Sequence, residues 1–312
     1  MTLSQVVAAY VTHRQAMGMR FHTEARTLRS FCRASGDVTM QEITAEQLLA
    51  FLAGSGPVTR YWERKHSALS GLYRFAVARG HVDHSPLPRT VPRPQQAFVP
   101  YIYSHEELRR LLNAVAANDN PRCRIDPDTY RTILLLLYGA GLRISEALAL
   151  TLVDVDLDAA VLCIRESKFY KSRLVPIGDD LLRILAAYGA RRRQQHAGAA
   201  SPFFVSRDGN AVTRQNAEMA FCRLRVQANV VCEGADARHQ PRLHDMRHAF
   251  AVHRLISWYR DGADVQRLLP KLSTYLGHVH IAGTQRYLTL TPELLRQASL
   301  RFERYAMEPS HE

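Results

Sequence analysis

The chain has 312 residues, 46% of them hydrophobic, so it can bury an ordinary globular core, and two domains are the default expectation for this length. This composition excludes a disordered, collagen-like or coiled-coil protein. The formal net charge of +12 and the isoelectric point near 9.8 indicate a polyanionic partner, either a nucleic acid or an anionic membrane surface.

No run of eighteen apolar residues occurs, and the start MTLSQVVAAYVTHRQ lacks the basic segment and apolar stretch of a signal peptide. We therefore expect no membrane span and a cytoplasmic location. The five cysteines are odd in number and form no C-x-x-C pair, which argues against a disulfide framework and a zinc ribbon. We expect buried free thiols at Cys32, Cys123, Cys163, Cys222 and Cys232.

Residues 1–85 are predicted to be helical throughout. Apolar residues at Leu3, Val6, Val7, Tyr10 and Val11 form the stripe of an amphipathic first helix. Further helices are expected over residues 23–34, 44–53 and 59–79, the second of them with a threonine N-cap at 44 and a glutamine three residues later.

The last of these helices is basic and carries aromatic residues at Tyr61 and Trp62. Such a face could follow a DNA backbone, although a merely solvated face fits the pattern almost as well. The candidate DNA contacts are Arg60, Arg64, Lys65 and Arg74.

Five prolines lie between Pro86 and Pro100, too many for a helix or a paired strand. We therefore predict a helical first domain over residues 1–85, a proline-rich linker over 86–103 and a second domain over 104–312. An extended linker rises about 3.1 Å per residue, so it could hold two domains on different sides of a duplex.

The second domain begins with Ser104 and Glu107 in capping-box spacing. A helix through residue 112 and an apolar helix over 130–138 should follow, ended by glycines at 139 and 141. Residues 153–177 contain β-branched runs separated by turns, which predicts a small antiparallel sheet. Helices resume at 179, and FFVSRDGNAVT predicts a short strand and turn. The fold class is therefore mostly α with a small antiparallel β-sheet in the second domain.

The first chemical motif is G-L-R-I-S-E-A at 141–147, which places Arg143 at the start of a helix. A helix N-terminus with an arginine is a ready phosphate site, because unpaired N–H groups and a two-pronged donor face the same anion. The alternative is a structural salt bridge from Arg143 to Glu146, three residues later.

The second motif is the basic turn S-K-F-Y-K-S-R between two predicted strands, from which Lys168 could reach a site and donate a proton. Lys171 and Arg173 share this turn and are candidate DNA contacts. An exposed turn lysine without a role is the alternative for each lysine.

The third motif, L-H-D-M-R-H, places His244 and Arg247 three residues apart, on one face of a helix whose start is marked by Pro241. A zinc hydrolase is a distant alternative, because His244 and His248 have the spacing of the two zinc ligands in H-E-x-x-H. Arg247 argues against it, since a permanent cation would lie close to the metal.

The fourth motif consists of L-G-H, ending at His278, and Q-R-Y, ending at Tyr287. Taken alone, a tyrosine such as Tyr287 has an ordinary structural explanation as a residue at the core or its rim.

Taken together, R…K…H-x-x-R…H…Y resembles the tyrosine recombinase (phage integrase) family, and especially its Xer-like members. The resemblance rests on GLRISEALAL, SKFYKSRLVPI, LHDMRHAFAVH, YLGH and QRYL, and it covers residues 104–305. Residues 1–85 are more loosely similar to the family's core-binding domain. The stretch 254–275 is longer than in Xer-like members. The resemblance implies a two-domain C-shaped clamp, with a helical core-binding domain and a mixed α/β catalytic domain.

The resemblance also implies the role of each residue. Tyr287 is the nucleophile and forms a 3′-phosphotyrosine, while Arg143 and Arg247 clamp the phosphate. His244 is the general base, His278 hydrogen-bonds the phosphate, and Lys168 protonates the leaving 5′ oxygen. Glu146 and His248 are expected to contact these catalytic residues and hold them in position, without touching the substrate. No metal and no cofactor is required.

The implied partner is double-stranded DNA with paired half-sites, bound by a homotetramer in a synaptic complex and possibly with related recombinases. The expected location is the cytoplasm, in association with the nucleoid. A C-terminal helix beginning at Thr291-Pro292-Glu293 would pack either on a neighbouring subunit or on its own domain. Two alternatives stay open: a type IB topoisomerase-like nicking-closing enzyme and a DNA-binding regulator without catalysis.

Overall fold

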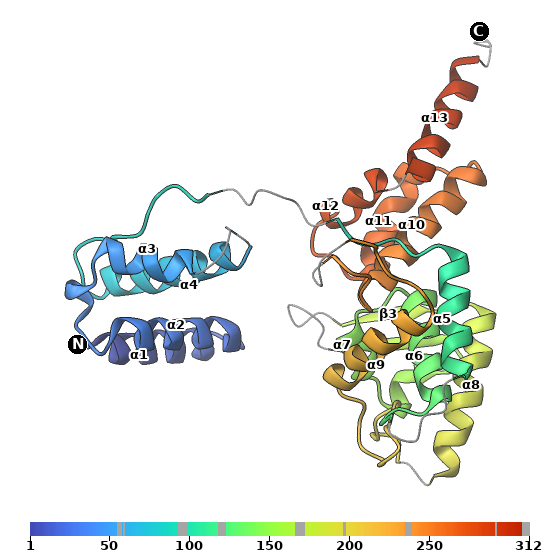
Figure 1. Cartoon of the computed structure of the whole chain (residues 1–312), viewed down its shortest axis with the longest axis horizontal. Coiled ribbons are helices and arrows are strands. Elements are labelled where there is room, and N and C mark those ends of the chain that lie inside the picture. The colour runs from blue at the N-terminus through green and yellow to red at the C-terminus, as the bar shows by residue number, and fades with distance from the viewer. Residues whose placement is uncertain are drawn as a thin grey trace. The chain divides into compact units, whose positions relative to one another are not determined.

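The computed structural model (Figure 1) describes residues 1–54, 58, 60–92, 99–117, 123–165, 172–195, 198–234, 239–290 and 292–307. The chain divides into two compact units, residues 1–98 and 99–312, and the division falls within the predicted proline-rich linker. Within the described residues, no helix is both long enough and apolar enough to cross a membrane.

Unit 1 is a helical bundle, drawn in blue to cyan in Figure 1, and each of its α-helices packs against the next one in the chain. The stripe predicted for the first helix is confirmed, since its five apolar residues are buried. The threonine cap at 44 is also confirmed, because its side chain accepts the N–H of Gln47. The elements are α1 (Leu3–Ala16), α2 (His22–Ser35), η1 (Met40–Glu42), α3 (Ala45–Ala53) and α4 (Arg60–Ala78).

The chain after α4 packs on unit 1, and this packing continues into the first residues of the predicted linker. Val82 is buried and Leu87 lies against the same hydrophobic core. The ring of His66, which stacks on Trp62, contacts the carbonyl of Pro88 through Nε2 at 3.0 Å. The chain after α4 is therefore held to unit 1 as far as Pro88.

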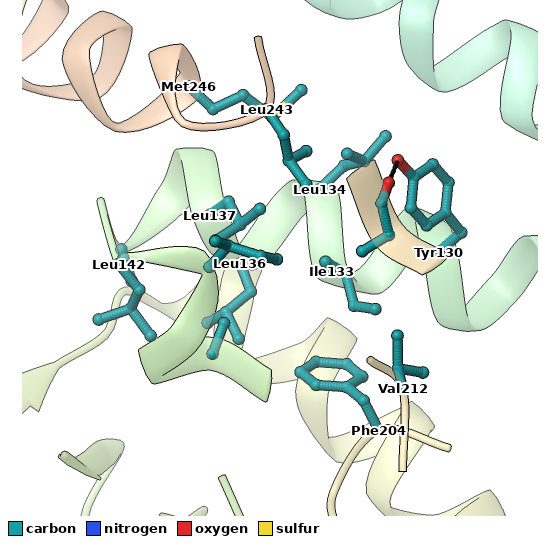
Figure 2. Packing of buried hydrophobic residues seen from close by; sticks show 14 of the residues in the cluster. Tyr130, Ile133, Leu134, Leu136, Leu137, Leu142, Phe204, Val212, Leu243 and Met246 are labelled. Atoms are coloured by element: carbon teal, nitrogen blue, oxygen red, sulfur yellow. Dashed lines mark hydrogen bonds between the residues drawn. The ribbon is translucent and has the colours of Figure 1, made fainter. Parts of the chain in front are cut away.

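Unit 2 begins with helices that enclose a large hydrophobic core. The Ser104–Glu107 capping box is confirmed, because each residue's side chain accepts the other's backbone N–H. Helix α6 is buried along most of its length, and Figure 2 shows its side chains close to Leu142, Phe204, Val212, Leu243 and Met246. The helices up to the middle of this unit are α5 (His105–Ala117), α6 (Pro127–Gly139), α7 (Ile144–Leu148), η2 (Leu152–Asp154), α8 (Asp179–Gln194) and α9 (Arg214–Gln227).

The predicted sheet is confirmed as a three-stranded antiparallel sheet in the order β1-β2-β3. Its strands are β1 (Val155–Asp156), β2 (Val161–Ile164) and β3 (Arg173–Pro176). Ile164 pairs with Arg173, so β2 and β3 form a hairpin that places Arg173 at its connected end. Residues 166–171 lie outside the described residues.

Two further expectations from the sequence were wrong. The segment FFVSRDGNAVT forms the predicted turn, but in place of the predicted strand it has one isolated bridge between Val205 and Ala211. The backbone N–H of Ser206 donates to the carbonyl of Asn210, so the turn begins directly after the bridge and leaves no room for a strand. The cysteines are free, but none is buried: four are half-buried and Cys222 is exposed.

The remaining elements are α10 (Asp245–Arg260), α11 (Val265–Leu276), α12 (Ala282–Gln285), η3 (Arg286–Thr289) and α13 (Pro292–Met307). The long stretch 254–275 forms the end of α10, a turn, and α11, which Asp264 caps. Helix α13 packs on α10 through the buried Leu294, whereas Leu295 and Phe302 are 50% and 71% exposed. In Figure 1 the C-terminal part of α13 (red) points away from the other helices of unit 2.

Candidate active site

Arg143 is the residue immediately before α7, as predicted, but the helix has only five residues and its start is not an open anion site. Glu146 fills that place: its carboxylate accepts the backbone N–H of Arg143 at 3.0 Å and its guanidinium at 2.6 Å. The same guanidinium donates to the carbonyl of Gly277 at 3.1 Å. The predicted salt bridge to Glu146 therefore forms, and it helps to fix the position of the Arg143 guanidinium.

Arg247 lies on α10 and is 2% exposed. Its guanidinium donates to the carbonyls of Gly141 at 2.7 Å and Leu276 at 2.5 Å, and lies 4.0 Å from the carboxylate of Glu146. Burial and the nearby charge of Arg143 lower its pKa to about 10, which still leaves it charged at neutral pH.

Arg173, predicted as a DNA contact, is instead an internal part of this cluster. Its guanidinium donates to both oxygens of Glu146, at 3.1 and 2.9 Å, and to the carbonyl of Tyr275 at 2.9 Å. A Cβ at Gly277, whose φ is +67°, would lie 2.8 Å from this guanidinium. Glycine at 277 thus serves both the left-handed end of α11 and the close approach of Arg173.

Three arginines therefore converge on one carboxylate and on one helix end. The carbonyls of residues 275, 276 and 277 accept from Arg173, Arg247 and Arg143 respectively, and so neutralise part of the negative end of α11. Burial alone would raise the pKa of Glu146, but hydrogen bonds and charge from Arg173, with those of Arg143, bring it down to about 2. Sequence reasoning missed the three carbonyls, although the glycine before His278 marks the helix end that supplies them.

His244 lies just before α10, not on the helix face that Pro241 seemed to begin. The helix starts at Asp245 because the intervening residues form a tight turn, in which the carboxylate of Asp245 accepts the N–H and the guanidinium of Arg242. Burial and the charge of Arg247 lower the pKa of His244 to about 4, so its ring is neutral at pH 7.

Tyr287 lies on η3 and is 1% exposed. Its hydroxyl is 3.0 Å from Nδ1 of His248, the neighbour of Arg247 in sequence. Burial raises the pKa of the phenol, and the charges of Arg247, Arg286 and Arg143 offset part of this effect.

His278 follows the end of α11. Its Nδ1 is 2.7 Å from the hydroxyl of Thr284, and its ring stacks on that of Tyr287 with centroids 6.1 Å apart. Burial and the charge of Arg247 lower its pKa to about 4. His278 therefore lies beside the predicted nucleophile as a neutral ring with one nitrogen fixed.

His248 connects the two parts of the site. Besides the contact with Tyr287, its ring meets that of His244 edge to face, with centroids 5.0 Å apart. Burial and the charge of its neighbours lower its pKa to about 3.

The remaining predicted residues are distributed differently. Lys168 and Lys171, and the side chain of Arg60, lie outside the described residues. Arg64 and Arg74 are exposed on α4, as a DNA contact requires. Lys65 does not fit that prediction, because it is 8% exposed and its ammonium donates to the carbonyls of Phe51 and Leu52 at the end of α3.

The described residues include no group of three or more His, Cys, Asp or Glu side chains that could hold a metal ion. The zinc alternative needs both His244 and His248 as ligands, whereas Nδ1 of His248 is engaged by Tyr287.

The sequence profile of the phage integrase family matches residues 102–293. The chain belongs to this family. The y4rB protein of Sinorhizobium fredii, assigned to the integrases and recombinases, is 41% identical over 97% of this chain and 98% of its own length. The tyrosine recombinase XerC of Chlorobaculum tepidum is 32% identical over 79% of this chain and 74% of its own length.

This chain also has the fold of solved integrase structures. The integrase of transposon Tn1549, in complex with transposon right end DNA, matches with a TM-score of 0.70 and 16% identity over 98% of this chain and 100% of that chain. A lambda integrase dimer bound to a COC′ core site matches with a TM-score of 0.64 and 19% identity over 90% of this chain and 96% of that chain.

Proposed function

We propose that this chain is a site-specific DNA recombinase that cleaves and rejoins strands through a 3′-phosphotyrosine at Tyr287. The observation that carries the proposal is the convergence of two arginines, three neutral histidines and one buried tyrosine at the junction of α7, α10, α11 and η3. Two fixed cations beside a hydroxyl match the needs of phosphoryl transfer to tyrosine.

Arg143 and Arg247 would bind the two non-bridging oxygens of the scissile phosphate, where charge develops in the transition state. Glu146 and the end of α11 fix the orientation of the two guanidinium groups. The neutral rings of His244 and His278 would hydrogen-bond the same phosphate.

Lys168 would protonate the leaving 5′ oxygen, and the product would be a phosphotyrosine with a free 5′ hydroxyl. One phosphodiester bond is exchanged for another, so a second strand's 5′ hydroxyl can reverse the step. The chemistry requires neither a metal nor a nucleoside triphosphate. Because Arg247 and Tyr287 are 2% and 1% exposed, the site has to open when DNA binds.

The proposed partner is double-stranded DNA with paired half-sites, consistent with the charge of +12. Arg64 and Arg74 on α4 and the undescribed Arg60 and Lys171 are proposed backbone contacts. The clamp formed by two units around a duplex remains a prediction.

A tetramer on two sites is proposed because four strands must be exchanged. A solved structure shows lambda integrase as a tetramer bound to a Holliday junction. The exposed Leu295 and Phe302 of α13 offer this chain an apolar surface for a neighbouring subunit. We propose that the protein acts in the cytoplasm, at the nucleoid.

A topoisomerase-like enzyme that reseals one site without a partner is the second function that fits this chemistry. Target duplexes would first be selected from a random library by capture of covalent protein–DNA adducts. Plasmids carrying one or two copies of the selected site would then be incubated with the protein. A recombinase exchanges segments between two sites, whereas relaxation of the one-site plasmid without exchange would favour the topoisomerase. If no duplex forms a covalent adduct, the result would favour a DNA-binding regulator without catalysis.

A further inference from the structure

The proton of Tyr287 has to leave before or during attack on phosphorus, and the sequence predicted His244 as its acceptor. We propose that His248 accepts this proton directly, and that His244 is left free to bind the phosphate. The inference rests on the proposed function and assigns one of its steps.

The hydrogen-bond inventory of the phenol supports this direction of transfer. The charge of Arg247 acts on the phenol of Tyr287, and a guanidinium has donors only, so its approach would occupy a lone pair of the phenol oxygen and not its proton. The single phenol proton is then available for Nδ1 of His248, 3.0 Å away. This arrangement requires the tautomer of His248 in which Nδ1 is unprotonated and Nε2 carries the proton.

The environment keeps His248 neutral before the reaction. The ring is half-buried and meets that of His244, and the charges of Arg286, Arg247 and Arg242 lie near enough to lower its pKa further. These groups favour the neutral, accepting form. A bound phosphate would bring negative charge to the same arginines, and so would favour the imidazolium that forms during attack.

The pair joins two elements that pack on each other, η3 with Tyr287 and α10 with His248, so opening of the site elsewhere need not separate it. The ring of Tyr287 belongs to a hydrophobic cluster with Phe250, Ala251 and Leu255 of α10, the helix that carries His248. His244, in contrast, precedes that helix and meets the edge of His248.

The O–H bond of Tyr287 breaks and its proton moves to Nδ1 of His248, while the phenol oxygen bonds to phosphorus. The bond from phosphorus to the 5′ oxygen breaks, and that oxygen takes a proton from Lys168. In the reverse reaction His248 returns its proton to the departing phenol.

The test uses His248→Asn, because the amide oxygen of asparagine can stand near the place of Nδ1 and accept the hydrogen bond, yet cannot take up the proton. We expect single-turnover formation of the covalent adduct to slow by about 10² to 10⁴, the usual worth of a proton acceptor. DNA binding and the unfolding temperature should stay close to wild type. A rate within a factor of three of wild type would overturn the proposal.

His253 supplies a matched control on the same helix. Its Nδ1 is 2.8 Å from the hydroxyl of Tyr138, and burial and the charge of His105 lower its pKa to about 4. His253→Asn therefore makes the same chemical change in a similar tyrosine–histidine pair away from the reaction. It should cleave at the wild-type rate.

Replacing Tyr287 by a fluorinated tyrosine separates proton transfer from positioning. Fluorine lowers the pKa of the phenol from its usual value near 10, so attack depends less on a base. The fluorinated protein should recover most of the rate lost in His248→Asn, whereas Arg143→Ala should gain nothing. An unchanged defect in His248→Asn would show that the histidine only positions the ring and would overturn its role as acceptor.

A nitrogen-15 NMR spectrum of the wild-type histidines gives an answer that needs neither a variant nor DNA. We expect an unprotonated Nδ1 at His248, and a protonated Nδ1 would overturn the proposal even if His248→Asn did not fold. Failure of the proposed function looks different, since the wild-type protein would then form no adduct at all.

Discussion

The guanidinium of Arg173 donates two hydrogen bonds, 3.1 and 2.9 Å long, to the carboxylate of Glu146. The same carboxylate holds Arg143, and Arg173 begins the strand that follows the Lys168 turn. One acidic residue therefore links the hairpin of the proposed general acid to the arginines of the proposed phosphate clamp.

This link predicts that Arg173→Lys slows cleavage at saturating DNA by about tenfold or more, because a lysine cannot reproduce a two-pronged contact. Arg165→Lys is the control, since Arg165 lies on the same hairpin and pairs with Asp154, but is 61% exposed. Single-turnover rates compare the two variants. Equal rates for Arg173→Lys and wild type would mean that the link has no part in catalysis.

Arg143→Ala and Arg247→Ala should each lose cleavage far more than DNA binding, since the charge that they stabilise develops chiefly in the transition state. Binding and single-turnover cleavage are measured on the same duplex. A variant that binds weakly but cleaves normally at saturation would make its arginine an ordinary phosphate contact. Arg247→Ala also removes a buried cation that two carbonyls accept from, so its unfolding temperature has to be measured beside its activity.

Lys168→Ala should slow cleavage by about 10² to 10⁴, the usual worth of a placed proton donor. Replacing the bridging 5′ oxygen by sulphur makes a leaving group that needs no proton, so this substrate should restore the rate of Lys168→Ala. Lys171→Ala should need no such rescue, and Arg143→Ala should show none. If Lys168→Ala is equally slow with both leaving groups, the lysine positions the DNA and the proton comes from another residue.

Acid should destabilise the protein through its four histidines of lowered pKa, at a pH where Glu146 is still charged. Burial holds the pKa of His244, His253 and His278 at about 4 and that of His248 at about 3, below the value near 6.5 of an unfolded chain. As the pH falls from 6.5 towards 4, these histidines therefore bind protons in the unfolded chain but stay neutral in the folded one, and the free energy of unfolding decreases.

The measurement is the unfolding temperature between pH 7 and pH 4.5. Glu146, with a pKa of about 2, contributes most of its loss below about pH 4.5 and little within this window. His253→Asn removes one of the four histidines and should flatten the dependence. A flat profile in the wild-type protein would show that these rings are protonated in the folded state.

The sequence predicted the elements and the chemistry better than the contacts. Short motifs place Arg143, His244, Arg247, His278 and Tyr287 in order, and local signals such as the threonine cap at 44 and the β-branched runs at 153–177 mark the elements. Such signals act between neighbours in the chain, so they can be read from sequence.

The contacts that orient the site join residues far apart in the chain. Nothing near Arg173 or Lys65 in sequence indicates that their cations bind inside the protein, to Glu146 in one case and to the end of α3 in the other. The pairing of Tyr287 with His248 in place of His244 depends on where α10 begins, and a turn stabilised by Asp245 decides that position.

The covalent bond at Tyr287 is the centre of the account, and a nicked duplex that traps the cleaved state tests it directly. The wild-type protein should form an adduct that survives denaturation, and mass spectrometry should locate the phosphate on Tyr287. Tyr287→Phe should bind the same duplex with unchanged affinity and form no adduct. An adduct that persists in the Phe variant, or a phosphate on another residue, would contradict the account.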